Sequence, residues 1–334
     1  MDSLTQIVLG AAVGEAVLGR KVGNKALLWG AIAGTIPDLD VLAKVFTDEL
    51  TATEMHRGFS HSILFAILFS PILGWLASRI HLKLNVDWKS WAWLMFGSLV
   101  THPMLDAHTN WGTTLFWPFE YKVAYNNIFI VDPLYTLPFL ICVIWVMTLR
   151  RDNPKRSRIN KIGLMISSSY MVLTLISKGI GYYHFQRSLE NQNIDYTNMM
   201  TNATVFNSIL WTATVETDDQ YLIGYYSLLD VGKEVEFTTF DKNRDLLGPA
   251  ANEEIVHRLG KLAQGWYIVL KEGDKWYIND MRFGQIGISN DPDSFPFSHE
   301  IWYEDDVLQV KQSQRNRENM GEALGQMFKR VLGK

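Results

Sequence analysis

Six side chains that can bind a metal ion occur as three pairs within one apolar part of the sequence. The pairs are Asp38 and Asp40, His56 and His61, and His102 and Asp106. Imidazole nitrogens and carboxylate oxygens together form a ligand set that suits zinc, manganese or iron. Ionisable residues at the ends of membrane segments are costly to keep there and usually mark a functional site. The three pairs therefore predict a site for a divalent metal, with zinc preferred and one to three ions bound.

The spacing within two of the pairs lets both side chains reach one point. His102 and Asp106 are four residues apart, so both project from the same face of a helix. Asp38 and Asp40 follow Pro37, where we expect a membrane helix to break. A spacing of two residues along an extended turn then allows both carboxylates to converge on one ion.

The third pair, His56 and His61, encloses an Arg-Gly turn just before the next apolar segment. Outside the three pairs, Asp132 precedes Pro133 at the start of another apolar segment. An acid followed by proline is typical of a helix N-cap with proline at the first helical position. A role for Asp132 as a ligand, or in support of one, stays open at this point.

Hydrophobic residues are distributed unevenly along the 334 residues. Residues 1–185 contain long apolar runs and predict an α-helical membrane bundle of about six spans. Residues 195–334 are polar and alternating and predict a smaller α+β domain outside the cytoplasm. The expected spans are 4–19, 24–43, 62–80, 90–107, 131–149 and 162–183.

Basic residues in the connecting segments predict the orientation, because lysine and arginine are retained on the cytoplasmic side. They cluster between the first and second, third and fourth, and fifth and sixth expected spans, with the densest group at residues 150–158. These three connections fall on one side of a six-span bundle. The six candidate ligands and the C-terminal domain then lie together on the non-cytoplasmic side of a bacterial inner membrane.

The C-terminal region has the pattern of an antiparallel β domain. Apolar and β-branched residues alternate or run together at 210–215, 221–226, 235–240 and 266–270. The segment 271–275 precedes another such run and is typical of a hairpin turn. We expect a helix over 252–264 and a further helix over 318–332 that docks on the domain.

Composition excludes several classes of function. A formal net charge of −4 and a pI of about 6.1 give no basic excess, so we expect no nucleic-acid partner. The single cysteine, Cys142, cannot form an internal disulfide. The sequence also lacks the zinc-protease motif His-Glu-x-x-His, the Gly-x-Ser-x-Gly motif and the phosphate-binding Gly-x-x-x-x-Gly-Lys.

An ordered set of motifs resembles the bacterial membrane-bound metal-dependent hydrolases, a family of inner-membrane hydrolases once linked to LexA binding. The motifs are the first six residues, 30–40, 56–62, 102–106 and 111–112, and the resemblance covers roughly residues 1–150. The family is distantly similar to zinc-dependent phospholipase C and the S1/P1 nucleases, whose sites also use Asp, His and a His-x-x-x-Asp pair. Relatives carry His where this chain has Gln6, which implies fewer ions or a differently closed ligand shell.

Taken together, the ligands and the resemblance predict a membrane-embedded, metal-dependent hydrolase that cleaves a phosphoester of a lipid or lipid-linked substrate. We expect Asp40, His56, His61, His102 and Asp106 to bind metal. Asp38 is either a further ligand or the general base, and Arg57 stabilises the charge of the phosphate. Two other classes stay open: a metal or proton transporter, and a non-catalytic membrane scaffold with a metal-stabilised core.

Overall fold

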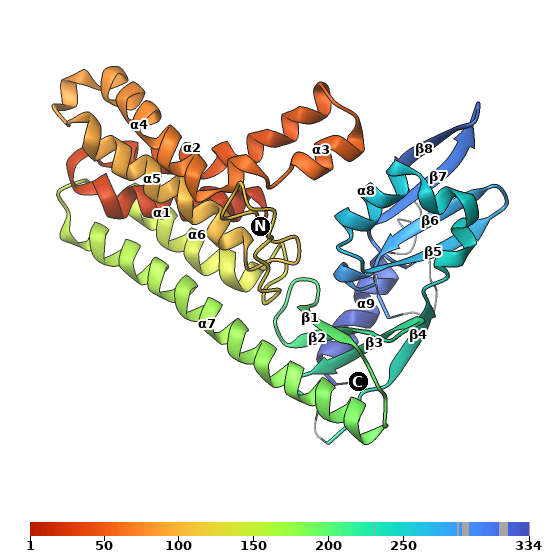
Figure 1. Ribbon diagram of the computed structural model, residues 1–334. Helices are drawn as coiled ribbons and strands as arrows, with labels where there is room; N and C mark the ends of the chain where they lie inside the picture. The colour runs from red at the N-terminus through yellow and green to blue at the C-terminus, as the bar shows by residue number, and fades with distance from the viewer. Residues whose placement is uncertain (231, 286, 289–293, 314–319, 334) are drawn as a thin grey trace. The chain divides into compact units, whose positions relative to one another are not determined.

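The computed structural model describes residues 1–230, 232–285, 287–288, 294–313 and 320–333. The chain divides into two compact units, Met1–Thr174 and Leu175–Lys334 (Figure 1). The first unit is helical, and the second contains two antiparallel sheets with short helices. This arrangement agrees with the expected order of a helical part followed by an α+β domain.

The first unit is built from ten helical segments among the described residues, and the last of them continues into the second unit. The segments are α1 (Ser3–Val22), α2 (Asn24–Thr35), the 3-10 helix η1 (Ile36–Val45), α3 (Glu49–Met55), η2 (Phe59–His61), α4 (Ile63–Ile80), η3 (Leu82–Leu84), α5 (Trp88–Asp106), α6 (Pro133–Thr148) and α7 (Pro154–Asn191).

Among the described residues, three helical stretches are long and apolar enough to cross a membrane, so the six predicted spans are not supported. They are Asn24–Val45, which joins α2 and η1, then Ile63–Ile80 and Pro154–Asn191. Helix α6 is apolar but has only 16 residues. Helices α1 and α5 are 20 and 19 residues long but are not among these candidate spans; α1 buries mostly small and polar residues, and α5 buries three polar residues beside large apolar ones. Their apolar runs reflect packing inside the helical unit, which a reading of hydropathy along the chain does not separate from contact with lipid.

Glycines allow α1 and α2 to pack with their backbones nearly in contact. Gly10 and Gly14 on α1 face Gly30 and Gly34 on α2, each pair with the spacing Gly-x-x-x-Gly. A Cβ atom added at Gly30 would lie 2.2 Å from the carbonyl oxygen of Gly10. Small residues at such positions permit close approach of membrane helices. The contact fixes the end of α2, from which η1 continues.

A buried ion pair joins α1 to the first turns of α7. Arg156 Nη2 lies 2.6 Å from Glu15 Oε2, and Arg156 Nη1 also donates to the Leu149 carbonyl oxygen at 2.8 Å. Both charged side chains are 3% exposed. Removing one partner of such a pair leaves a buried charge without compensation and is strongly destabilising. The pair therefore ties the N-terminal helix to the last helix of the first unit.

Asp132 caps α6, as its position before Pro133 predicts. Its Oδ1 accepts hydrogen bonds from the backbone N–H groups of Leu134 and Tyr135, at 2.9 and 3.2 Å. The hydroxyl of Tyr170 donates to its other carboxylate oxygen at 2.8 Å. Capping of α6 therefore explains why an acid occupies position 132.

The second unit contains two four-stranded antiparallel meanders (Figure 1). The first is formed by β1 (Asn198–Ala203), β2 (Leu210–Glu216), β3 (Gln220–Ser227) and β4 (Phe237–Asp241). The second is formed by β5 (Tyr267–Glu272), β6 (Lys275–Asp280), β7 (Ser298–Glu304) and β8 (Val307–Gln312). Between the two sheets in sequence lie the 3-10 helix η4 (Arg244–Asn252) and α8 (Glu254–Leu262), and η5 (Met281–Phe283) follows β6. One hydrophobic core includes residues of both sheets.

The predicted docking helix is α9 (Met320–Val331), although residues 318 and 319 of the expected range lie outside the described residues. Met327 is buried in the core that both sheets share. Arg330 binds Asp230 through two hydrogen bonds of 2.6 and 2.7 Å. An apolar contact and a bidentate ion pair thus hold the helix on the sheet domain.

We predict that Gly30→Ala destabilises the first unit by about 1–3 kcal/mol or more, because its Cβ would collide with the α1 backbone. The measurement is the thermal midpoint of the purified protein in detergent. Gly179→Ala is the matched control, since a Cβ at Gly179 on α7 meets nothing within 4 Å. Equal midpoints for the two variants would contradict the close packing of α1 on α2.

Candidate metal centre

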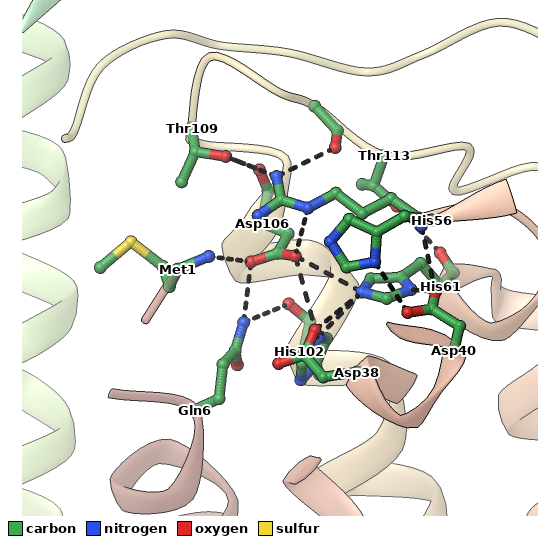
Figure 2. Close-up of polar contacts among 12 residues, drawn as sticks. Met1, Gln6, Asp38, Asp40, His56, His61, His102, Asp106, Thr109 and Thr113 are labelled. Carbon is green, nitrogen blue, oxygen red and sulfur yellow. Dashed lines mark hydrogen bonds and ion pairs between the residues drawn. The ribbon is translucent and has the colours of Figure 1, made fainter. Parts of the chain in front are cut away.

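Four of the six predicted ligands converge at one point. Asp38, His61, His102 and Asp106 each offer one ligand atom, and these atoms lie within 4.8 Å of one another. Figure 2 shows the four side chains pointing toward a common centre. Asp38 comes from η1, His61 from η2, and the other two from the last turns of α5. Three separate segments therefore build the cluster.

The separations between ligand atoms match those around a tetrahedral ion. His61 Nε2 lies 3.2 Å from His102 Nε2, 3.3 Å from Asp38 Oδ1 and 3.6 Å from Asp106 Oδ2. His102 Nε2 lies 3.3 Å from Asp38 Oδ1 and 3.8 Å from Asp106 Oδ2. Zinc bonds of about 2.0–2.2 Å in a tetrahedron separate neighbouring ligands by about 3.3–3.6 Å. The five separations given lie within about 0.2 Å of this range, and all four ligand atoms lie within 4.8 Å of one another, so the cluster is close to the size of a zinc site.

Both histidines are oriented so that Nε2 can bind a metal. His102 Nδ1 donates to the carbonyl oxygen of Gly34 at 2.6 Å. A carbonyl oxygen only accepts, so Nδ1 carries the proton and the lone pair is on Nε2. His61 Nδ1 lies 3.2 Å from Asp40 Oδ2, which sets the same tautomer. Metal-binding histidines usually make this kind of contact through their second nitrogen.

Asp106 Oδ2 is a buried carboxylate oxygen that accepts no hydrogen bond among the described residues. The Asp106 side chain is 1% exposed, and Oδ2 faces His61, His102 and the Arg57 Nε, the last at 3.3 Å. A buried acceptor left in this state is unusual and calls for an explanation. A cation between the four ligand atoms would satisfy it, so the donor set and this oxygen without a hydrogen bond both fit a divalent metal.

The other oxygen of Asp106 is held by residues at the start of the chain. Gln6 Nε2 donates to Asp106 Oδ1 at 2.9 Å, and the amino group of Met1 contacts the same oxygen (Figure 2). The spacing of the paired ligands gives no signal for Met1, and Gln6 stands out only through the family resemblance. The structure adds that Gln6 holds a candidate ligand from outside the cluster.

Asp40 and His56 lie beside the cluster instead of within it. His56 Nδ1 is 2.7 Å from Asp40 Oδ1, and Asp40 Oδ2 accepts hydrogen bonds from the Ser60 hydroxyl at 2.7 Å and the Arg57 backbone N–H at 3.1 Å. The geometry makes Asp40 a support for His61. Direct metal binding by Asp40 and His56 stays a prediction.

The reason for this division is the conformation after Pro37. The expected extended turn is a 3-10 helix, η1, that runs on to Val45. A 3-10 helix has three residues per turn, so side chains two residues apart point in directions about 120° apart. Asp38 therefore faces the Nε2 atoms of both histidines, whereas Asp40 faces His56 and the far side of His61.

Arg57 forms part of the wall behind Asp106. Its Nη1 donates to the Thr109 hydroxyl at 3.0 Å and to the Gly112 carbonyl oxygen at 3.4 Å. Its backbone φ is 63°, an uncommon value for a residue with a side chain. Such conformations persist where surrounding contacts impose them, and they gather at functional sites. The guanidinium is thus fixed beside a candidate ligand.

The electrostatics of the cluster favour a positive charge at its centre. Burial disfavours a charged imidazole, yet hydrogen bonds to Asp38 and Asp40 raise the pKa of His61 above its ordinary value. Asp106 adds to the effect. Asp38 is the open side of the cluster, because its side chain is 25% exposed while those of His61, His102 and Asp106 are at most 1% exposed.

The family described as YdjM inner membrane protein matches residues 1–184. The chain belongs to this family. The match includes every residue of the metal cluster, and it ends before the first strand of the second unit.

Two curated relatives match parts of the chain, and one of them is named as an inner membrane protein. The uncharacterized protein YfhP of Bacillus subtilis is 31% identical over 161 residues, which are 43% of this chain and 46% of that protein. The inner membrane protein YbcI of Escherichia coli is 35% identical over 101 residues, 30% of this chain and 57% of that protein. The chain thus spans about half the length of the curated relatives it matches. No solved structure matches it.

We predict that His102→Ala and Asp106→Ala each lose bound metal, measured as metal per protein by mass spectrometry after purification. Both residues contact the same centre, so the double variant should be little worse than either single one. His108→Ala is the control, because its Nδ1 pairs with Asn127 outside the cluster.

The same measurement tests the two residues beside the cluster. His56→Ala should retain most of the metal, because His56 reaches the cluster only through Asp40. A loss as complete as that of His102→Ala would return His56 to the ligand set that the sequence predicts.

Proposed function

We propose that the chain is a membrane-embedded hydrolase that uses a divalent metal, zinc before manganese or iron, to cleave a phosphoester of a lipid or lipid-linked substrate. The observation that supports this most is the convergence of His61 Nε2, His102 Nε2 and Asp106 Oδ2 within 3.8 Å of one another, with the partly exposed Asp38 beside them. Catalytic zinc sites have three protein ligands and an open position, unlike closed structural sites.

The three buried members, His61, His102 and Asp106, are the ligands in this proposal. Asp38 then occupies the open side and acts as the general base, with its Oδ1 directed at the centre. A zinc ion bound there would lower the pKa of a water molecule and polarise a phosphoryl oxygen. Asp38 accepts the proton from that water, because it is the one carboxylate of the cluster that solvent reaches.

Arg57 supplies a fixed positive charge next to this centre. Its contacts with Thr109 and Gly112 hold the guanidinium in place before any substrate binds. Charges positioned in advance stabilise developing negative charge without reorganisation. In the proposed reaction Arg57 holds Asp106 in place. It also stabilises the negative charge that develops on the phosphoester in the transition state.

We predict that Asp38→Asn keeps the metal and loses turnover by about 100-fold or more, since an amide cannot accept a proton. The measurements are metal content and release of phosphate-containing product from phospholipid vesicles. Asp106→Asn is the comparison and should lose metal together with turnover.

Three results would redirect the proposal. Loss of metal in Asp38→Asn would make Asp38 a ligand and leave the proposed reaction without its base. Unchanged turnover in both variants would refute the proposed hydrolase activity of this site. Metal flux into vesicles without product release would favour a transporter instead.

The first two candidate spans each have a basic residue at the end away from the cluster, and the third has basic residues at the end away from the second unit. Lys25 starts α2, Arg79 ends α4, and Lys155 and Arg158 start α7, whereas Asp38 lies near the end of the first span. Basic residues are retained in the cytoplasm. The cluster and the second unit therefore belong, in this proposal, to the non-cytoplasmic side.

We predict that a cysteine at Asn191 reacts with a membrane-impermeant maleimide on intact cells, while one at Asn153 does not. The two positions lie at opposite ends of α7, so the result does not depend on the number of other spans. The background is Cys142→Ala. The reverse pattern would place the cluster on the cytoplasmic side.

A further inference from the structure

Two apolar segments beside the metal cluster expose large side chains. On η1, the side chains of Leu42, Val45 and Phe46 are 56%, 73% and 84% exposed. In the connection after α5, Phe119 and Tyr121 are 72% and 71% exposed. A soluble surface rarely gathers so much apolar area, and such patches mark interaction sites. We call the two segments, residues 39–46 and 116–121, the apolar rim.

Both parts of the rim are attached to the segment that carries His61. Asp38 and Asp40 belong to the same 3-10 helix as the first part. The second part follows Leu115, whose carbonyl oxygen accepts a hydrogen bond from the Ile63 N–H at 3.0 Å, while the Thr114 hydroxyl donates to the Arg57 carbonyl oxygen at 2.7 Å. The rim is therefore linked to the cluster by a shared helix and by hydrogen bonds.

The rim is continuous with two candidate membrane spans. Residues 39–45 of its first part form about the last third of Asn24–Val45, and Phe46 follows directly. Its second part includes Trp117, whose ring lies 5.0 Å from that of Phe59, and Phe59 in turn lies 5.4 Å from Phe65 on the first turns of α4. Aromatic side chains at the end of a span are typical of the membrane interface.

Helix α3, which follows η1 in the chain, has the surface of a helix that faces water. Helix α3 exposes Glu49 and Glu54 and buries Leu50 and Ala52, the pattern of a helix that faces solvent. The apolar face of η1 has the opposite character, with Lys44 as its one basic side chain, long enough to reach the headgroup level. The boundary between lipid and water thus falls between η1 and α3.

We infer that the apolar rim inserts into the membrane leaflet next to the cluster, so that a substrate enters sideways from the bilayer. The acyl part of an amphiphile would lie along the rim while its polar head reaches Asp38. Insertion of the rim stands on the exposed side chains alone. The nature of the substrate rests on the proposed function above.

Insertion is tested with the full chain in lipid nanodiscs. Phe46→Cys and Phe119→Cys in a Cys142→Ala background are labelled with an environment-sensitive fluorophore. Nitroxide-bearing lipids should quench both reporters several-fold more than aqueous iodide does. Glu49→Cys on α3 and Asp274→Cys in the β5–β6 turn are controls that iodide should quench. Rim reporters that behave like these controls would overturn the inference, whether water or a protein covers the rim.

Sideways entry is tested by a ratio of two activities. Phe46→Glu should lower the turnover of a long-chain phospholipid in vesicles by about tenfold or more relative to that of a short-chain, monomeric ester, because a carboxylate opposes insertion. Glu49→Gln should leave the ratio unchanged. Phe46→Ser replaces the first variant if that one is not monodisperse. An unchanged ratio would refute sideways entry, whereas a parent protein that cleaves neither ester would refute the proposed function and leave the quenching result standing.

Discussion

The carboxylate of Asp106 is buried in a helical unit, and much of the first unit's architecture serves to compensate its charge. An isolated carboxylate in such a place is prohibitively costly unless it is paired and hydrogen-bonded. Arg57, Gln6 and the Met1 amino group supply those partners from two distant parts of the sequence. They leave Oδ2 directed at two imidazole nitrogens. The same constraint therefore explains the strained Arg57 backbone and the burial of the start of α1.

Compensating this charge depends in turn on close helix packing. The glycine contact between α1 and α2 brings the Gly34 carbonyl to His102, and it brings Gln6 to Asp106. Larger residues would separate the two backbones and with them the second contacts of both ligands. Polar residues buried for this purpose also make α1 and α5 less apolar than a lipid-facing helix.

The sequence predicted those features that depend on local spacing. The i,i+4 pair on α5, the Asp132 cap, the β-rich second unit and its docking helix follow from patterns within a few residues. Features that depend on conformation between segments could not be predicted. The separation of Asp38 from Asp40 required the knowledge that η1 is a 3-10 helix. Hydropathy alone did not show which apolar helices face lipid. A glycine-rich helix that packs against other helices has apolar residues in its sequence just as a lipid-facing helix does.

Every contact described for the cluster comes from residues of the first unit, and the match to the inner-membrane family covers the same part of the chain. All four candidate ligands thus come from the first unit. Among the described residues, the two β-meanders contribute no atom to the four-residue cluster. Asp38, 25% exposed, marks the one open side of the cluster, since the remaining ligands are enclosed by helices whose packing the glycines and the Glu15–Arg156 pair hold in place.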